Sequence, residues 1–274
     1  MLGRTIHHYH IVDILSEGGY GSIYRAMNTT TQQLVVIKIE KKESLKNEKE
    51  IYQLLQNEPG FPMLLDSIEQ PMAIVLPLLG DSLSQILLKR KIFSLKTTLQ
   101  CGLQMLERVR VIHEHGIIHY DIKPSNFVLG LDHKTIYLID FGLSECYINN
   151  NQHRHGYQVD EIKGTYQYSS RHIHNGMVGS RRDDLESWIY ILIKMQCGKL
   201  PWQHLRKNKE VLFMKRKWTA KRLTKSLPLA FYTLLVMIKN LGYKQTPNYS
   251  LLKNTLIQCA KDHHLILDDD YDWS

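Results

Sequence analysis

One short stretch limits what this chain can fold into. Residues 119–126 read His-Tyr-Asp-Ile-Lys-Pro-Ser-Asn, and Asp140-Phe141-Gly142 follows a short distance downstream. Spaced in this way, one carboxylate can meet a hydroxyl nucleophile while an amide and a second carboxylate hold a metal ion. Those are the parts that phosphoryl transfer requires. We therefore expect the rest of the chain to supply a nucleotide.

Length and composition are those of a protein that folds on its own. The 274 residues are 43% hydrophobic, which suits one large domain or two lobes. The net charge of +8 suits an acidic or phosphorylated partner, although a solvated basic surface explains it equally well. Charge alone therefore does not identify a partner.

Cysteine spacing and hydropathy indicate the compartment. The four cysteines lie far apart without a Cys-x-x-Cys pair, so neither a zinc site nor a disulfide framework is indicated. Residues 1–10 lack an apolar signal core, and no run approaches the roughly 18 to 20 apolar residues of a membrane span. We expect an intracellular protein, cytoplasmic or nuclear, that does not enter a membrane.

The first 80 residues have mainly strand character. Residues 9–15 lead into a small-residue turn that contains Gly18, Gly19 and Gly21, and a plain hairpin explains such a turn as well as a functional loop does. The run 34–39 is apolar except for Lys38. A lysine in a buried strand is costly unless an anion meets it, and the alternative is an edge strand whose lysine reaches water.

A helix is expected over residues 44–56, where apolar side chains share one face. Glu48 and Glu50 lie one turn before that face, and either could pair with Lys38. Residues 72–79 form a further apolar strand that ends at Gly80, which we interpret as a hinge.

Beyond residue 80 the pattern becomes helical. Apolar side chains recur at steps of three or four residues over 95–112. A short strand at 136–139 would deliver Asp140, and 184–197 is apolar on most sides, as expected of a buried central helix. A strongly basic stretch at 206–225, an amphipathic helix at 227–241 and an acidic tail at 268–272 follow.

Together these motifs resemble those of a eukaryotic-type protein kinase over nearly the whole chain. They occur in the expected order: the glycine turn, Val-Val-Ile-Lys, the acidic helix, His-Tyr-Asp-x-x-x-x-Asn and Asp-Phe-Gly. Finer features are similar to the casein kinase 1 superfamily, which includes the vaccinia-related and tau tubulin kinases. They are the stretches 121–127, 180–186, 198–202 and 247–249, and Tyr-Ser-Ser-Arg at 168–171 in place of Ala-Pro-Glu.

The resemblance implies an α+β fold with two lobes, a small β-rich N-lobe at about 1–79 and a larger helical C-lobe at about 80–274, together forming a single kinase domain over 1–274. It implies an ATP-dependent serine/threonine kinase that uses Mg²⁺, acts on protein substrates and is a monomer. The competing interpretation is a pseudokinase, a binding module that keeps the fold without efficient transfer.

The resemblance also implies catalytic roles. Asp121 would accept or orient the proton of the substrate hydroxyl, and Lys123 would neutralise charge on the transferred phosphoryl group. Asn126 and Asp140 would hold Mg²⁺, which prefers oxygen ligands.

The nucleotide would be bound by Lys38 at its α and β phosphates, with Glu48, or its rival Glu50, holding the lysine in place. The turn and an apolar slot for adenine would complete the site, with the backbone of Pro77 and Leu79 at the adenine edge. These residues are Leu15, Ser16, Glu17, Gly18, Gly19, Tyr20, Gly21, Ser22, Ile23, Val36, Leu76, Pro77, Leu79 and Val128.

Three positions depart from the family pattern. Ser16 replaces the first glycine of the turn, and Val36 replaces the usual alanine. Tyr120 replaces the arginine of His-Arg-Asp, and a phenol cannot pair with a phosphorylated activation loop as a guanidinium does. We therefore expect constitutive activity without loop phosphorylation.

Basic side chains could select the substrate. In the superfamily, such residues beside the activation segment favour acidic or already phosphorylated substrates, and Arg181, Arg182 and the lysines at 215–221 could do the same. The alternative is that both arginines are structural and tether that segment. Lys-Arg-Lys-Trp at 215–218 also allows nucleic-acid contact, but an exposed helix face explains it more simply, so no nucleic-acid partner is expected.

Overall fold

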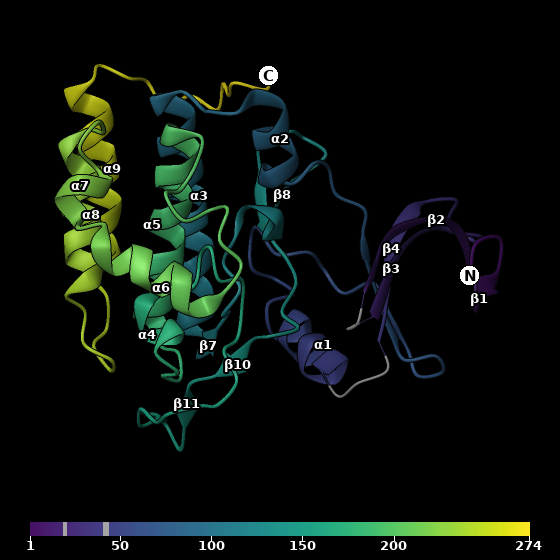
Figure 1. Cartoon of the computed structure of the whole chain (residues 1–274). Coiled ribbons are helices and arrows are strands. Elements are labelled where there is room, and N and C mark those ends of the chain that lie inside the picture. Colours follow the sequence, from purple (N-terminus) through teal and green to yellow (C-terminus); the bar gives the residue numbers. More distant parts are fainter. Residues whose placement is uncertain (19–20, 41–43) are drawn as a thin grey trace. The chain divides into compact units, whose positions relative to one another are not determined.

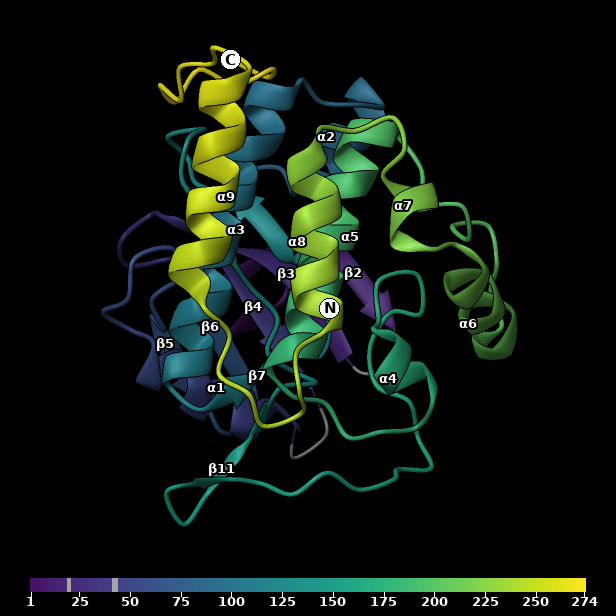
Figure 2. The same ribbon diagram turned by 90° about the vertical axis from the view of Figure 1, so that its left-hand side faces the viewer.

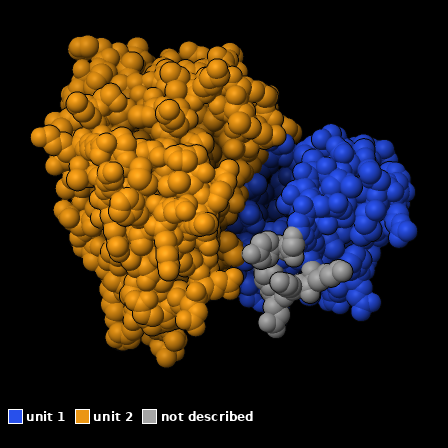
Figure 3. Space-filling model, in the orientation of Figure 1, with its two compact units in different colours: residues 1–80, 137–142 blue, residues 81–136, 143–274 orange. Residues whose placement is uncertain are grey.

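A computed structural model describes residues 1–18, 21–40 and 44–274, which fall into two compact units. Unit 1 comprises residues 1–80 and 137–142, and unit 2 comprises residues 81–136 and 143–274 (Figure 3). The lobe boundary expected near residue 79 differs in one respect, because the segment with Asp-Phe-Gly belongs to unit 1. Phe141 explains this placement, since it is fully buried and its ring packs edge-on against Tyr52 at 5.1 Å.

Unit 1 is built on an antiparallel sheet in the order β1-β2-β3-β4-β6-β5, of which Figure 1 labels β1 to β4. The helix that follows β4 is α1 (Ser44–Leu54). The strands are β1 (Thr5–Ile6), β2 (Tyr9–Gly18), β3 (Gly21–Asn28), β4 (Leu34–Ile39), β5 (Asp66–Ile68) and β6 (Ala73–Pro77).

Alternation along the strands gives this sheet two different faces, because successive side chains in a strand point to opposite sides. The register pairs Ile23 with Lys38 and Val36 with Leu76, so these side chains share one face, on which Ile23, Lys38 and Val36 stay partly exposed. The other face forms the core of the unit, with the buried residues Tyr24, Ala26, Val35, Ile37 and Val75.

Unit 2 is mainly helical, and α3, α5, α8 and α9 lie side by side (Figure 2). Its helices are α2 (Leu83–Arg90), α3 (Leu95–Glu114), α4 (Arg171–His174), α5 (Arg181–Cys197), α6 (Asn208–Lys217), α7 (Ala220–Leu223), α8 (Leu229–Lys239) and α9 (Tyr249–Asp262), with the 3-10 turn η1 (Pro124–Asn126). Short strands connect them: β7 (Ile117–Ile118), β8 (Phe127–Leu129), β9 (Ile136–Leu138), which runs on into unit 1, β10 (Glu145–Cys146), β11 (Ile148–Asn149) and β12 (Gln152–His153).

The predicted central helix is α5, and its ends have clear physical causes. The Ser180 N–H donates to the Asp183 carboxylate at 2.8 Å, which satisfies a backbone donor at the start of the helix. Gly198 ends it with φ 73°, a conformation that glycine adopts without strain. The helix between them is almost entirely buried, as its apolar composition predicted.

The helices that were not predicted include α2 and α9. The start of α9 is set by Asn248, whose side-chain oxygen accepts the N–H of Leu251 at 2.9 Å. In α2, the Ser82 hydroxyl accepts from the Gln85 N–H and the Gln85 side chain accepts from the Ser82 N–H, which is a capping box. Both caps are visible in the sequence, but they need to be read together with the apolar spacing that follows them.

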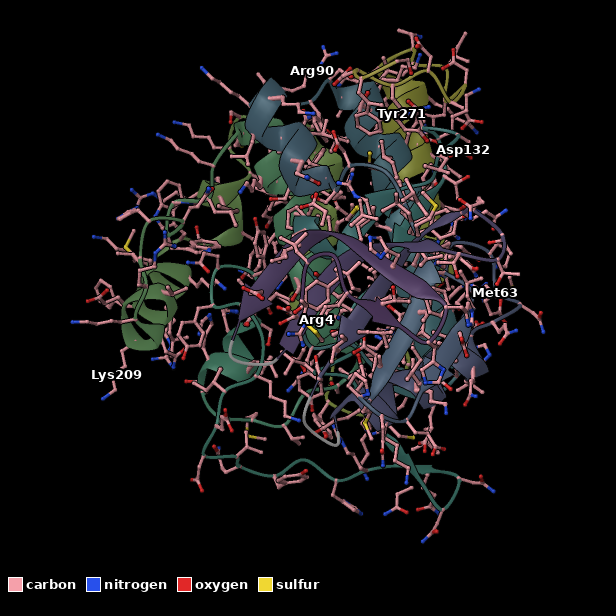
Figure 4. All side chains as sticks on the ribbon, turned by 90° about the vertical axis from the view of Figure 1, so that its right-hand side faces the viewer. Arg4, Met63, Arg90, Asp132, Lys209 and Tyr271 are labelled. Carbon is pink, nitrogen blue, oxygen red and sulfur yellow. The ribbon has the colours of Figure 1, made fainter. Side chains whose placement is uncertain are left out.

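The acidic tail binds the start of α3 within unit 2. Asp272 accepts from the Ser94 N–H at 2.6 Å and from its hydroxyl at 2.7 Å, while Lys96 pairs with Asp268 at 2.7 Å. Tyr271, near the C-terminus in Figure 4, stacks on Trp273 at 4.7 Å. The tail therefore contacts α3.

No helix in the described part of the chain is both long and apolar enough to span a membrane.

Candidate active site

Lys38 is the centre of a charged cluster in unit 1. Its Nζ donates to Glu48 Oε2 at 2.7 Å and to Asp140 Oδ1 at 2.9 Å, and Glu40 Oε1 lies 3.3 Å away. The lysine therefore meets anions, as its position in an apolar strand requires. Burial lowers the pKa of Lys38, but the carboxylates of Glu48 and Asp140 outweigh burial and raise the pKa above its ordinary value, so the ammonium stays charged.

The structure distinguishes the two acids that the sequence left open. Glu48 is fully buried and bonds Lys38, whereas Glu50, two residues further along α1, is exposed. The other oxygen of Glu48 accepts the Phe141 N–H at 3.2 Å. One carboxylate on α1 thus holds both the lysine of β4 and the segment that carries Asp140.

Three carboxylates surround the Lys38 ammonium. Burial is the main cause that raises the pKa of Glu48 to about 7, and Asp140 and Glu40 raise it further while Lys38 lowers it. A divalent cation beside this cluster would interact favourably with its carboxylates.

Asp140 is held in an unusual backbone conformation. Its φ is 68°, and its N–H donates to the Tyr52 hydroxyl at 3.1 Å. A positive φ is uncommon outside glycine, and it persists here because Tyr52 and the burial of Phe141 fix the chain on both sides. The Asp140 side chain remains 42% exposed, so its carboxylate is accessible from solvent.

The glycine turn joins β2 and β3, which pair as far as Gly18 and Gly21. Gly19 and Tyr20 lie outside the described residues. Gly21 has φ +152° and approaches the end of β4 so closely that a Cβ there would come within 2.4 Å of the Ile39 carbonyl oxygen. Glycine at this position therefore has a steric cause beyond turn formation.

Most of the expected adenine-binding residues belong to unit 1. Leu15 and Glu17 on β2 are exposed, Ile23 and Val36 lie on the partly exposed face of the sheet, and Leu76 is 8% exposed. The remaining positions follow the same strands and the segment after β6: Ser16, Ser22, Pro77 and Leu79. Val128, by contrast, lies on β8 in unit 2 and is buried.

Asp121 is held on both carboxylate oxygens in unit 2. Its Oδ1 accepts from the Thr165 N–H at 3.0 Å and from the Thr165 hydroxyl at 2.7 Å. Its Oδ2 lies 2.5 Å from Lys123 Nζ. The Asn126 amide nitrogen donates to the Asp121 carbonyl oxygen at 2.9 Å. The amide oxygen is the other polar atom of the Asn126 side chain.

The loop at residues 119–126, which we call the catalytic loop, is tied to α5 by one buried carboxylate. Asp184 accepts the N–H of His119 at 2.7 Å and the N–H of Tyr120 at 3.0 Å. His113 Nε2 lies 3.0 Å from the same carboxylate. Because Asp184 is 1% exposed, these bonds compete little with water and fix the backbone directly before Asp121.

Tyr120, the least standard residue of the loop, is almost buried. Its hydroxyl donates to Glu145 at 3.0 Å and accepts from Arg154 at 2.5 Å and from the Gly179 N–H at 3.1 Å. Burial, and next the Glu145 carboxylate, raise the pKa of the phenol well above its usual value. The hydroxyl therefore stays protonated and remains a donor.

Arg181 and Arg182 are tethered to protein atoms. Arg181 donates to the Lys244 carbonyl oxygen at 2.7 Å, and its guanidinium lies 5.0 Å from the centre of the Tyr147 ring. Arg182 donates to the Leu241 carbonyl oxygen at 3.2 Å. These contacts favour the structural role that the sequence left open over binding of a substrate anion.

Lys215 is also not on an exposed helix face, and that expectation for it was wrong. Its side chain is 1% exposed, and its Nζ lies 2.9 Å from the Tyr166 carbonyl oxygen, 2.5 Å from that of Ser169 and 3.0 Å from His174 Nε2. Burial lowers the pKa of this lysine. We call the chain from Asp-Phe-Gly at 140–142 to Tyr-Ser-Ser-Arg at 168–171 the activation segment, and Lys215 anchors the end of this segment on α6.

The site residues thus form two groups. In unit 1 the structure brings together Lys38, Glu48 and Asp140, and in unit 2 it brings together Asp121, Lys123 and Asn126. Thr165, which bonds Asp121, was missed by sequence reasoning. Its only local signal is the preceding Gly164, whose φ of +87° suits a glycine next to the Tyr120 carbonyl oxygen.

Each unit offers an oxygen donor of the kind that Mg²⁺ takes. This ion usually takes one or two protein ligands and completes its shell with phosphate oxygens and water. Asp140 offers an accessible carboxylate, and the amide of Asn126 is oriented through its nitrogen. Among the described residues, no group of three or more His, Cys, Asp and Glu side chains could by itself hold a metal ion.

Residues 9–257 match the protein kinase domain family, so the chain belongs to that family over nearly its whole length. Within it, the chain is a serine/threonine protein kinase of the casein kinase 1 type, as its similarity to casein kinase I homologues shows.

Three relatives illustrate this similarity. A protein of Encephalitozoon cuniculi named "Probable casein kinase I homolog" is 32% identical over 96% of this chain and 92% of its own length. A "Probable serine/threonine-protein kinase" of Dictyostelium discoideum is 32% identical over 96% of this chain. A casein kinase I homologue of Kluyveromyces lactis is 31% identical over 97% of this chain. The chain spans about half of these last two proteins, 56% and 53% of their lengths.

Exchanging Glu48 for glutamine tests the Lys38 pairing. Glu48→Gln keeps the shape of the side chain but removes the charge that holds the ammonium. Because a hydrogen bond between charged groups is worth about 1.5–3 kcal/mol, kcat/KM for ATP should fall roughly 10- to 100-fold. Steady-state kinetics at varied ATP would measure it.

The matched control is Glu50→Gln on the same helix, which should change kcat/KM for ATP by less than about twofold. The pH profile adds a second measurement. With the pKa of Glu48 raised to about 7, acidification through that pH protonates the carboxylate and weakens the wild-type pairing. Glu48→Gln should lack this acidic limb, and equal losses in the two variants would contradict the assignment.

Proposed function

We propose that residues 1–274 act as one kinase domain that transfers the γ-phosphoryl group of ATP to serine and threonine hydroxyls of protein substrates, as a monomer. The observation that carries this proposal is the fixed carboxylate of Asp121, bonded on one oxygen by Thr165 and on the other by Lys123. These contacts hold the carboxylate that we propose as the base in one orientation.

In the proposed reaction, Asp121 orients the substrate hydroxyl and takes its proton as the oxygen forms a bond to the γ-phosphorus. The bond between that phosphorus and the bridging oxygen breaks, and its electron pair leaves with ADP. Lys123 neutralises charge on the transferred group, and Lys38 binds the α and β phosphates. Mg²⁺ held by Asp140 and Asn126 would offset phosphate charge.

Nucleotide binding completes the proposal. The apolar residues Ile23, Val36 and Leu76 share one sheet face with Lys38, which supports an adenine slot beside a phosphate-binding lysine. Glu17, Gly18 and Ser22 flank the turn that we propose to cover the phosphates, together with Leu15, Ser16, Gly19, Tyr20 and Gly21. We propose Pro77, Leu79 and Val128 as further contacts of the base.

A pseudokinase is the competing function. It is disfavoured because each polar group that transfer requires is present and Lys38 is already paired with Glu48. Ser16 in place of glycine and Val36 in place of alanine are the features that support it.

Exchanging Asp121 for asparagine separates the two functions. Asp121→Asn removes the base, so phosphate transfer from radiolabelled ATP to casein should fall by roughly 10²- to 10⁴-fold. Asp160→Asn, an exposed carboxylate ahead of Thr165, serves as the matched control and should keep the wild-type rate. Equal signal from wild type and Asp121→Asn would support the pseudokinase.

We further propose that the kinase is constitutively active. The support is Tyr120, whose bonds to Glu145 and Arg154 join parts of the activation segment without a phosphate. The four cysteines, all of them free thiols, support the prediction of an intracellular protein, cytoplasmic or nuclear.

Phosphatase treatment tests constitutive activity. Purified protein freed of phosphate should keep its rate on casein within about twofold, because no loop phosphate takes part in ordering the site. Mass spectrometry would verify that phosphate has been removed. A sample that becomes strongly active only after treatment with an upstream kinase would contradict the proposal.

Acidic substrates are proposed on the basis of surface charge. Lys209 points away from the body of α6 in Figure 4, and Lys217 and Lys221 are also exposed. Together with the net charge of +8, these side chains give the surface near α6 and α7 a positive potential. Arg181 and Arg182 contribute little to this proposal, since carbonyl oxygens already bind them.

A panel of serine peptides tests substrate choice. Acidic and phosphorylated peptides should have kcat/KM values roughly 10-fold above neutral ones at low salt, with the difference shrinking toward 1 M salt as the Debye length falls to about 3 Å. The combined variant Lys209→Glu, Lys217→Glu, Lys221→Glu should reduce the preference. Equal rates on all peptides with the wild-type enzyme would remove the idea.

A further inference from the structure

Glu145, the first residue of β10, lies in a cluster of donors that the mechanism above does not use. Its carboxylate accepts from the Tyr120 hydroxyl at 3.0 Å, from Arg154 Nη1 at 2.9 Å and from Lys163 Nζ. Arg154 Nη2 also donates to the Tyr120 hydroxyl and, at 3.1 Å, to the Gly179 carbonyl oxygen. All five residues belong to unit 2, so the cluster is described within one body.

A tyrosine suits the chemistry of this cluster better than an arginine would. The phenol oxygen donates to Glu145 and accepts from Arg154 and Gly179, whereas a guanidinium can only donate. An arginine at position 120 would also add a third cation beside Arg154 and Lys163. The pattern of Tyr120 with Glu145 therefore balances charge inside the protein.

The cluster connects with the catalytic carboxylate along two routes. Tyr120 directly precedes Asp121 in the chain. Lys163 lies two residues before Thr165, whose N–H and hydroxyl both bond Asp121 Oδ1. Gly164 completes the contact, because a Cβ there would come within 2.3 Å of the Tyr120 carbonyl oxygen. The backbone of the activation segment thus touches the catalytic loop at this point.

Glu145 keeps its charge in this environment and remains reachable. Burial alone would raise its pKa, but the bonds from Lys163 and Arg154 outweigh that effect and hold the pKa below its usual value. The Glu145 side chain is 32% exposed and that of Lys163 is 37% exposed. A small anion from solvent could therefore enter if the carboxylate were removed.

We propose that the Glu145 carboxylate is a resident anion that positions Asp121, by holding Tyr120, Arg154 and Lys163 together where a phosphorylated loop would otherwise supply the negative charge. Glu145 is a positioning residue, since it acts through Tyr120 and Thr165 and does not touch the reacting atoms. The inference rests on the proposed constitutive activity and gives it a structural cause.

Removal of the carboxylate with replacement by a free anion tests this inference. Glu145→Ala leaves two cations facing an empty space, so kcat on casein at saturating ATP should fall roughly 10- to 100-fold. Sodium sulfate, titrated against sodium chloride at constant ionic strength, should then raise kcat several-fold with saturation. Wild type and Asp121→Asn should show no such increase, because their anion site is filled in both cases.

Two further variants separate the effect of the negative charge at position 145 from the effects of side-chain size and of position in the chain. Glu145→Gln fills the space without charge, so its kcat should also fall and sulfate should not restore it. Glu114→Ala removes an exposed carboxylate that pairs with Arg110 on α3 and should leave kcat unchanged. Wild-type kcat for Glu145→Ala or Glu145→Gln, or a loss in Glu145→Ala that sulfate does not reverse, would overturn the inference.

If Glu145→Ala is too unstable for a kinetic assay, its thermal unfolding tests the inference instead. Sulfate should then raise the Tm of Glu145→Ala by several degrees more than that of wild type, because an anion that binds only the folded state stabilises it. Equal shifts would overturn the inference. A wild-type enzyme that is inactive before treatment with an upstream kinase would instead contradict the proposed function, so the two failures are distinguishable.

Discussion

The buried carboxylate of Asp184 is the interaction on which unit 2 depends. It accepts the backbone N–H groups of His119 and Tyr120 at the start of the central helix α5. Buried backbone donors that lack a partner are costly, so the bonds to Asp184 fix the backbone of the catalytic loop. Thr165, in the activation segment, fixes the Asp121 carboxylate. The orientation of the Asp121 carboxylate is therefore set by bonds to other parts of unit 2.

Charge balance explains the unusual residues of both units. In unit 1, the carboxylates of Glu40, Glu48 and Asp140 surround Lys38. In unit 2, Arg154 and Lys163 both bond the Glu145 carboxylate directly, and the Tyr120 phenol donates to the same carboxylate. The first cluster contains the lysine and the aspartate that we propose to meet nucleotide and Mg²⁺, whereas in the second the chain supplies both the cations and the anion. That difference separates the part of a kinase that must bind substrate from the part that must only stay ordered.

Local patterns predicted much of the fold and of the site. The apolar periods marked β4, α3 and α5 well. Of the two alternatives that the sequence left open for Lys38, the structure shows the one with an anion as partner. The sequence pattern could not predict that Thr165 lies beside Asp121 or Arg154 beside Tyr120. These bonds join residues far apart in the chain, and no periodic spacing of residue types indicates them. The prediction that Lys215 lies on an exposed helix face was wrong for a related reason. A basic stretch is expected at the surface, and the sequence does not show that the carbonyl oxygens of Tyr166 and Ser169 accept from this lysine.

The burial of Lys215 has a consequence for chemical labelling. Its amine donates to the backbone of the segment at Tyr166 and Ser169 and lies under the ring of Trp202 at 5.3 Å. An acylating reagent cannot reach this nitrogen while the segment rests on α6, although it reaches the exposed neighbour Lys217 at once. Lys215 is thus a natural reporter group, whose rate of acylation relative to Lys217 measures how often the end of the activation segment opens.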